Sequence, residues 1–317
     1  MINVSIAKFI MKRFQRFPSK SDAKAGLLQE IFNHKTFLSG TDAEKKQIML
    51  NASNSKFEDE LGFPVDKYFG FSLRPYLEGK TVLDLGCLTG GRSAVWIERY
   101  GIKHLTGIDV DPVYIDAATQ FAASKNIENA TFKTAFGESL PFADGSFDSI
   151  VTFDVFEHVQ ELEKVLAECY RVLKPGGQLV SIFPSYYQPI EHHLSLVTRF
   201  PGLQYLFSGK TLVRAYYEIL DERGEDAYWY KRSIPELKDY EKGNTINGTT
   251  ISLFRKLLRK KPWKKIFQSH LPIGSVGRSI ERRPWLKPIS ILMKPLTYLP
   301  GLEEVFQQRV SFIMEKA

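Results

Sequence analysis

Residues 82–93 read VLDLGCLTGGRS, and this stretch decides the fold. It begins with apolar residues typical of a buried strand, breaks into glycines, and continues from Arg92 with a helical pattern. A glycine loop between a strand and a helix exposes backbone N–H groups beside the carboxyl end of the strand, and a helix start favours negative charge. The stretch therefore predicts a nucleotide-type binding site at the edge of a parallel sheet.

Strand-like and helix-like segments alternate downstream, in the order that a doubly wound α/β sheet requires. We expect strands at 82–85, 104–110, 130–136, 147–153 and 178–183, and helices at 93–100, 112–124 and 162–173. Asp111 suits the N-cap of the second helix, because Pro112 follows it at the first helical position. Residues 309–316 alternate apolar and polar side chains, which predicts a final strand in the same sheet.

The spacing of the loop differs from that of a dinucleotide-binding loop, which reads G-x-G-x-x-G and holds a pyrophosphate. Here three residues separate Gly86 from Gly90, and the acid Asp84 precedes both. An acid would repel a pyrophosphate, whereas it could accept a hydrogen bond from an ammonium group or fix the loop. The stretch resembles motif I, D-x-G-x-G-x-G, of class I S-adenosylmethionine (SAM)-dependent methyltransferases. Leu88 stands where that family usually has its middle glycine, and its side chain is expected to narrow the approach to the methionine part of SAM.

Asp109 ends the second expected strand, nineteen residues beyond Gly90. An acid at about this distance can accept hydrogen bonds from ribose hydroxyls, and in the resembling family this position is the ribose ligand. A turn or helix cap is the competing interpretation, although Asp111 suits that role better.

Residues 137–148 resemble the family's G-D-A-x-x-L-P-F-x-x-x-x-F-D region. Aligned on Leu-Pro-Phe, Phe136 stands where the family has an acid that receives the adenine amino group. A phenyl ring can flank adenine but cannot accept that hydrogen bond. Backbone groups of Phe136 and Gly137, or the side chain of Glu138, could replace it.

Residues 153–159 (FDVFEHV) resemble the family's E-H-V turn, which lines the cofactor and substrate crevice. Phe153 corresponds to a position that contacts the methionine part of SAM. Glu157 and His158 are candidates for acid and base; the favoured alternative is that Glu157 orders the loop and His158 caps a helix. Residues 171–177 (RVLKPGG) match a structural turn of the family.

The resemblance covers about residues 66–184 and implies a Rossmann-like, mostly parallel seven-stranded sheet with SAM as cofactor. The expected cofactor-binding residues are Asp84, Gly86, Cys87, Leu88, Gly90, Asp109, Val110, Phe136, Gly137 and Phe153. Four regions are expected: a helical N-terminal cap (1–56), the SAM-binding core (57–183), a substrate lid (184–248), and C-terminal helices with the last strands (249–317).

The expected lid is long and rich in aromatic residues, which suit sugar or aryl substrates but also build small cores. Tyr186 and Tyr187, with His158, are the candidate substrate contacts. His193 is the preferred general base and His192 the second choice, because a neutral imidazole can take a hydroxyl proton. Packing or surface roles for these histidines remain open. No spacing supports a metal site. The segment loosely resembles methyltransferases of bacterial polysaccharide and glycan biosynthesis.

Much of the formal charge of +7 is local. Seven Lys and Arg fall within 255–265, a second group lies within 278–287, and an amphipathic basic pattern begins at residue 2. We interpret these as basic helices. They fit solvated helix faces, peripheral contact with an anionic membrane, or nucleic acid. Nucleic acid is the least favoured because no RNA-binding module is recognisable.

Composition favours a globular cytoplasmic protein, associated with the inner membrane face if the basic segments bind lipid. The two cysteines, Cys87 and Cys169, do not make a disulfide framework, and no apolar run reaches the length of a membrane span. We expect methyl transfer to a hydroxyl of a sugar or lipid-linked glycan. The alternatives are N- or C-methylation of a small metabolite, and a binding protein without catalysis, suggested by Leu88 and Phe136.

Overall fold

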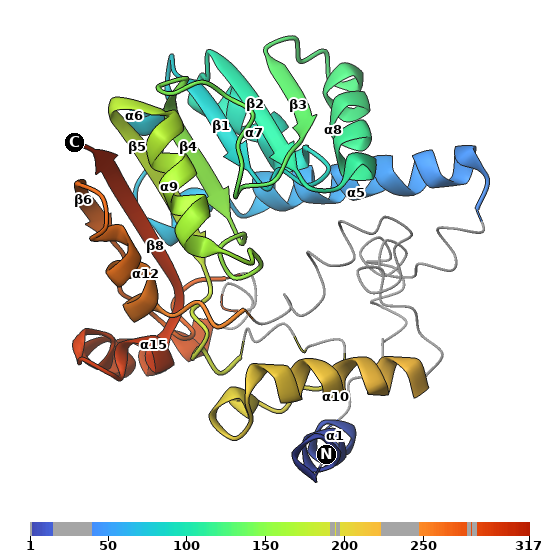
Figure 1. The fold of residues 1–317 in the computed structure, drawn as a ribbon, viewed down its shortest axis with the longest axis vertical. Coiled ribbons are helices and arrows are strands. Elements are labelled where there is room, and N and C mark those ends of the chain that lie inside the picture. Colours follow the sequence, from blue (N-terminus) through green and yellow to red (C-terminus); the bar gives the residue numbers. More distant parts are fainter. Residues whose placement is uncertain are drawn as a thin grey trace.

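The computed structural model describes residues 2–14, 40–190, 194, 197–222, 247–277, 280 and 284–317. Its centre is a sheet in the order β3-β2-β1-β4-β5-β8-β6, with a short β7 paired to β8 (Figure 1). The strands are β1 (Thr81–Leu85), β2 (His104–Asp109), β3 (Ala130–Thr134), β4 (Phe147–Phe153), β5 (Leu173–Phe183), β6 (Trp263–Gln268), β7 (Leu271–Pro272) and β8 (Gln307–Lys316). Strands β1 to β5 are parallel, and β8 runs antiparallel between β5 and β6. The predicted α/β fold is confirmed.

The order of the strands creates a crevice. The chain runs outward from β1 through β2 to β3, then returns to place β4 on the other side of β1. Ligands bind at such a reversal, outside the carboxyl ends of the strands. The glycine loop follows β1 at this point.

Helices cover both faces and one edge of the sheet. They are α1 (Ile2–Arg13), α5 (Asp42–Gly62), α6 (Arg74–Leu77), α7 (Gly91–Tyr100), α8 (Pro112–Ser124), α9 (Leu162–Val172), α10 (Gly209–Glu222), α12 (Ile251–Leu258), α14 (Lys287–Met293) and α15 (Glu303–Phe306). Short 3-10 turns are η1 (Val65–Tyr68), η2 (Leu203–Tyr205), η3 (Pro284–Leu286) and η4 (Lys294–Tyr298). Asp111 caps α8 as predicted, because its carboxylate accepts from the N–H of Val113 at 3.0 Å.

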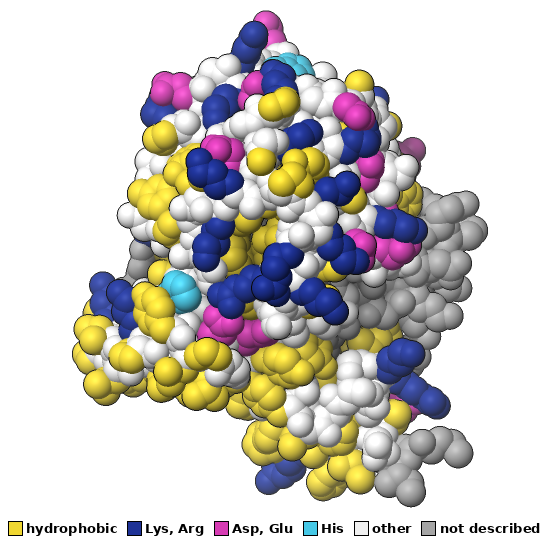
Figure 2. Space-filling view, turned by 60° about the vertical axis from the view of Figure 1, so that its left-hand side comes forward, with side chains coloured by type: hydrophobic (Ala, Val, Ile, Leu, Met, Phe, Trp, Pro, Cys, Tyr) yellow, Lys and Arg dark blue, Asp and Glu magenta, His cyan; other side chains and the backbone are white. Residues whose placement is uncertain are grey.

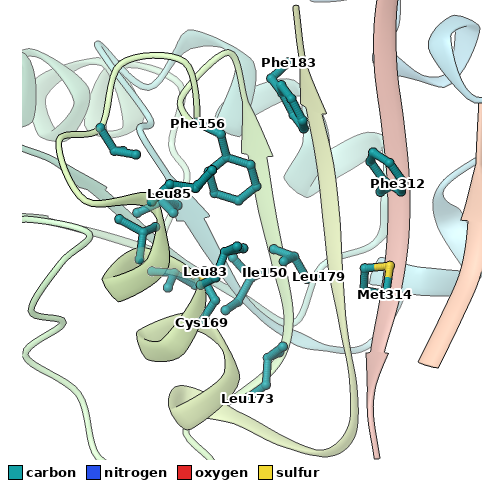
Figure 3. Close-up of a cluster of buried hydrophobic side chains, with 14 of the residues drawn as sticks. Leu83, Leu85, Ile150, Phe156, Cys169, Leu173, Leu179, Phe183, Phe312 and Met314 are labelled. Carbon is teal, nitrogen blue, oxygen red and sulfur yellow. The ribbon is translucent and has the colours of Figure 1, made fainter. Parts of the chain in front are cut away.

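The period of two along each strand divides the core between the faces of the sheet. In β1, Leu83 and Leu85 enter a cluster with α9 and α12, while Val82 enters a second cluster with η1, α6 and α7. The first cluster is anchored by Phe156, Phe183 and Phe312, which approach one another from the loop after β4 and from two strands (Figure 3). These two clusters pack on opposite faces of the sheet.

Helix α5 lies along the lower edge of the sheet, beneath β1, β2 and β3 (Figure 1), and packs on α7 and α8. It begins with a capping box, in which Thr41 and Glu44 bond reciprocally. α5 runs to Gly62 and so continues through the predicted boundary between a cap ending at 56 and a core starting at 57.

A third cluster joins α1 to α10, with Ala7 and Met11 packed among Leu194, Leu212 and Ile219. Lys8 forms ion pairs with Glu218 and Glu222 of α10. Tyr216 and Tyr217 belong to this cluster, so these two lid aromatics serve packing rather than substrate binding.

Two local predictions need correction. The basic segment 255–265 is not one helix: α12 ends at Leu258 and β6 begins at Trp263, because Pro262 cannot continue a helix. The helix expected over 162–173 ends at Val172, and β5 begins at Leu173, where an irregular register against β4 absorbs the Pro-Gly-Gly turn.

Candidate active site

The loop after β1 is held in place by its neighbour β2. The N–H groups of Gly86 and Cys87 both donate to the carbonyl of Ile108, at 2.8 and 2.9 Å. Gly86, Leu88 and Gly90 all have positive φ, of 80°, 49° and 72°. Glycine adopts this region freely, whereas Leu88 does so at some cost, and non-glycine residues with such strain cluster at functional sites.

Close packing on every side explains the glycines of the loop. A Cβ at Gly90 would lie 2.8 Å from the Cβ of Ala118, and one at Gly86 would collide with the side chain of Val155. The side chain of Leu88 packs into the cluster between α5 and α8, beside Ile48 and Tyr114. Part of the bulk of Leu88 is thus taken up by this cluster, and its effect on the approach to SAM stays a prediction.

Asp84 lies fully buried under the loop. Ser93 of α7 donates to its Oδ2 at 2.6 Å, so this carboxylate ties the strand to the following helix. Burial raises the pKa of Asp84 to about 6. The hydrogen bond from Ser93 lowers this pKa but offsets the effect of burial only partly. Of the two predicted roles, this contact supports fixing the loop. A buried carboxylate at this point also makes the crevice favourable to a cationic ligand.

Cys87 takes part in the glycine loop through its backbone N–H group. Its side chain is buried against Gly107, and burial raises the pKa of the thiol well above its usual range. A neutral thiol of this kind is inert.

Asp109 connects the ends of two strands. Its Oδ2 accepts from the N–H of Leu88 at 3.1 Å, and its Oδ1 accepts from the N–H of Asp111 at 3.1 Å. Each carboxylate oxygen can accept more than one hydrogen bond, so Asp109 is also suited to ribose hydroxyls. Val110, half-buried, follows directly at the mouth of the crevice.

The turn after β3 contains Glu138, one of the groups expected to replace the missing acid at Phe136. Glu138 Oε1 accepts from the N–H of Gln160 at 3.1 Å, while its Oε2 is buried without a hydrogen-bond partner. Phe136 accepts from Ser139 through its carbonyl, and Gly137 lies against Leu85 of β1. Glu138, two residues beyond Phe136, therefore offers a buried acceptor oxygen in the turn after β3.

Charged and aromatic side chains meet at the end of β4. Asp154 has a φ of 58°, and its carboxylate pairs with Arg309 of β8. The ring of Phe153 lies under the guanidinium of Arg92, 3.9 Å from its centroid, and against Tyr68 at 5.8 Å. A contact of Phe153 with the methionine part of SAM stays a prediction.

Lys56 of α5 is a third cation in this group, and the sequence motifs gave no sign of it. Burial, followed by repulsion from Arg92, lowers the pKa of Lys56 to about 8. The carboxylates of Asp59 and Asp154 act in the opposite direction. Lys56, Arg92 and Arg309 come from α5, α7 and β8, so only the folded chain brings them together.

The turn after β4 is held by residues at the C-terminal end of the expected lid and just beyond it. Asn247 donates to the carbonyls of Phe156 and Val159 at 2.8 and 2.9 Å, and Thr249 donates to Phe156 at 3.0 Å. Glu157 is buried, and its Oε1 lies 3.8 Å from Nε2 of the partly exposed His158. Their proximity fits either an acid–base pair or an ordered loop.

Part of the lid is placed against the core. Tyr186 donates its N–H to Thr249 at 2.8 Å, and the rings of Tyr187 and Tyr205 stack with centroids 6.0 Å apart. Ser185 donates to the buried Glu304 at 2.5 Å, which joins this segment to α15. The candidate bases His192 and His193 lie outside the described residues.

Residues 83–181 match the family model described as "Methyltransferase domain". Norajmaline N-methyltransferase of Rauvolfia serpentina is 35% identical over 107 residues, which cover 33% of this chain and 36% of that protein. Demethylmenaquinone methyltransferase of Tropheryma whipplei (strain Twist) is 35% identical over 156 residues, which cover 48% of this chain and 61% of that protein.

Among solved structures, an S-adenosylmethionine-dependent methyltransferase from Mesorhizobium loti is 16% identical, with a TM-score of 0.49 over 76% of this chain and 93% of that one. The alignments with both curated relatives span less than two thirds of their lengths. The residues that match the family model include the glycine loop, Asp109 and the turn after β4.

Proposed function

We propose that this chain is a SAM-dependent methyltransferase. The observation that carries the proposal is the glycine loop tied to Asp109, at the reversal point of a methyltransferase domain. SAM supplies a methyl group on a positively charged sulfur, which makes it ready for in-line transfer.

The residues of the crevice fit the parts of this cofactor. Asp109 suits the ribose, and the partner-free buried Oε2 of Glu138 suits the adenine amino group. The buried negative charge of Asp84 favours the positive end of SAM. Lys56 and Arg92 suit the carboxylate of its methionine part, because a carboxylate would relieve the repulsion between the two cations.

For the acceptor, we propose a hydroxyl on a sugar or lipid-linked glycan. The stacked Tyr187 and Tyr205 offer aromatic faces with polar tips, which suit a sugar ring. The relatives' names give an alkaloid nitrogen, tocopherol and demethylmenaquinone as acceptors of those proteins. Acceptors thus differ among proteins that share the domain, and the residues outside it would decide the choice here.

The chain's contribution to transfer is mainly orientation. Bringing the acceptor oxygen in line at ~3–3.5 Å from the methyl carbon removes much of the entropic barrier. A base then takes the hydroxyl proton. His193 is proposed for this role on its sequence position, and His158, beside Glu157, is the described alternative.

Calorimetry tests the cofactor half of the proposal. The wild-type chain should bind SAM and its demethylated product S-adenosylhomocysteine, and Asp109→Asn should weaken both by about 10-fold or more, because a hydrogen bond to a charged group is lost. Absence of binding by the folded wild-type chain would contradict the proposal.

Product analysis tests the acceptor half. With methyl-labelled SAM, NMR of the product should show a methyl on oxygen; a methyl on nitrogen or carbon would reject the hydroxyl acceptor while leaving the methyltransferase activity in place. Comparison of His193→Ala with His158→Ala then assigns the base: the variant that flattens the pH profile of kcat identifies it.

A further inference from the structure

The helix α14 has a burial pattern opposite to that of an ordinary surface helix. It buries Ser290, which is 6% exposed, and presents Ile291 and Leu292 to solvent at 69% and 78% exposure. The hydroxyl of Ser290 donates to the carbonyl of Lys287 at 2.7 Å, so the buried polar group is satisfied within the helix. Ordinary surface helices bury the apolar side and expose the polar side. This helix therefore presents its apolar side chains outward.

The exposed apolar residues extend beyond α14 into the neighbouring turns. Seven large side chains between residues 285 and 302 are exposed: Trp285, Ile289, Ile291, Leu292, Tyr298, Leu299 and Leu302. We call these seven the apolar face. Contiguous apolar surface of this kind marks a site of contact with a partner or a membrane.

The turn around Tyr298 connects the apolar face to the sheet. The ring of Tyr298 stacks on His270, with centroids 4.2 Å apart, and Gln307 of β8 donates to the carbonyl of Thr297 at 3.4 Å. Thr297 itself is fully buried. These contacts hold the exposed side chains in position without hiding them.

The charged residues within the segment that carries the apolar face are of one sign. Residues 284–302 contain Lys287 and Lys294, both exposed, and no Asp or Glu. The acids next in sequence are neutralised or buried: Glu303 pairs with Arg255 at 2.6 Å, and Glu304 accepts from Ser185 and Ser252. The Arg255–Glu303 pair also fixes the basic helix α12 beside α15.

Further cations lie on α12 and β6. Lys256, Arg259 and Lys265 are exposed, and the described part of the chain offers them no ion-pair partner. Figure 2 shows Lys and Arg gathered in the middle of this side of the molecule, with Asp or Glu side chains just beneath them and apolar side chains along its lower left. Apolar side chains bordered by Lys and Arg match a bilayer with anionic headgroups, in which the apolar groups enter the acyl boundary and the cations remain at the headgroups.

We propose that the apolar face docks this chain onto the surface of an anionic membrane. Trp285 and Tyr298 would lie at the level of the headgroups, where aromatic rings with a polar atom are favoured. Ile291 and Leu292 would enter the acyl boundary. None of the helices in the described ranges is long and apolar enough to cross a bilayer. The proposal does not depend on the methyltransferase activity.

Vesicle binding tests the proposal on the full chain. Sedimentation with vesicles of phosphatidylcholine and phosphatidylglycerol should carry the wild type, while vesicles of phosphatidylcholine alone should carry much less. Added salt should weaken binding, because it screens the headgroup charge. The double variant Ile291→Ser, Leu292→Ser should bind at least about 10-fold more weakly. Both side chains are exposed, so its circular dichroism should match the wild type.

A matched control is Leu61→Ser, which removes an exposed leucine from α5; its vesicle binding should equal that of the wild type. Trp285 emission should shift to the blue on binding and be quenched by brominated lipid, with Trp285→Phe removing the signal. Failure of the wild type to bind anionic vesicles would overturn the proposal. So would light scattering that shows a dimer dissolved by the double serine variant, because a second copy would then cover this face.

Discussion

At the residue scale, the site divides into side chains that sequence spacing can locate and side chains that it cannot. Asp84, Gly86, Gly90 and Asp109 follow one another at the ends of adjacent strands, so their spacing alone predicts their assembly. Lys56 and Arg309 reach the same crevice from positions more than two hundred residues apart. No local pattern marks such a long-range pair, and only the tertiary structure reveals it.

Asp84 provides a prediction that separates stability from binding. Its folded pKa of about 6 exceeds the ordinary value of 3.8. Between these values the folded state holds the proton and the unfolded state does not, so the free energy of unfolding falls as pH rises through this window. Above pH 6 the ionised carboxylate therefore destabilises the fold. Asp84→Asn, which can still accept from Ser93, should raise the free energy of unfolding at pH 8 by about 1–3 kcal/mol.

Chemical denaturation at pH 8 and pH 4 measures this effect, and the gain should vanish at pH 4. The same variant should bind SAM more weakly, because the crevice loses a negative charge. A variant that is less stable than the wild type at pH 8 would show that the carboxylate is compensated in the fold.

The lowered pKa of Lys56 leads to a prediction on proton uptake when SAM binds. Its pKa of about 8 leaves it roughly half protonated at pH 8, and a nearby ligand carboxylate would raise that pKa again. Binding of SAM at pH 8 should therefore take up about 0.5 proton at this residue, and close to none at pH 6. Calorimetry in buffers of different ionisation enthalpy measures the uptake.

The control is Lys56→Arg, which keeps the positive charge but does not titrate. Because the amino group of SAM itself titrates near pH 8, the informative quantity is the difference between wild type and variant. Equal proton uptake by both would place the methionine carboxylate away from Lys56.

At the scale of elements, hydrophobic period and turn residues predicted most of the sheet and its helices. The boundaries of β4 and α8 agree with the structure residue for residue, because turn signals and the Asp111–Pro112 cap mark them clearly. The segment 255–265 was misjudged because its composition, rich in Lys and Arg with two Leu, favours a helix while Pro262 ends one.

Gly91, the first residue of α7, packs against α5 and offers a prediction in which local helix propensity and packing oppose each other. Alanine is the better helix former by up to about 1 kcal/mol, so Gly91→Ala at an exposed helix position would stabilise. Here a Cβ would collide with the Ser53 carbonyl and lie 2.9 Å from the Cβ of Lys56. We expect a loss of about 1–3 kcal/mol in the free energy of unfolding, together with weaker SAM binding as Lys56 is displaced.

Denaturant titration and calorimetry check both effects. Gly79→Ala is the matched control, because a Cβ there meets open space although φ is positive. It should show only the smaller cost of the left-handed backbone, with SAM affinity unchanged. Unchanged stability in Gly91→Ala would mean that α5 can shift without loss.

At the scale of the whole molecule, the contacts of the lid relate the crevice to the apolar face. Tyr186 and Tyr187 follow β5 directly, and Ser185 between them and the sheet bonds to Glu304 of α15. The sequence predicted that basic C-terminal segments could contact a membrane. It could not show that α14 turns Ile291 and Leu292 outward, because that short helix is apolar on both faces in sequence apart from Lys287 at its start and Ser290.

Together, the two proposals predict that vesicle binding assists turnover of a lipid-borne acceptor. A chain docked through the apolar face would meet such an acceptor at a raised local concentration. For an acceptor embedded in phosphatidylglycerol vesicles, the double variant Ile291→Ser, Leu292→Ser should turn over about 10-fold more slowly than the wild type. For a water-soluble analogue of the acceptor headgroup, both proteins should have the same kcat/KM, because neither side chain lies in the crevice. If the double variant instead lost turnover on both substrates to the same degree, the crevice itself would be damaged. If the variant and the wild type turned over the vesicle-borne acceptor at equal rates, docking would not assist catalysis.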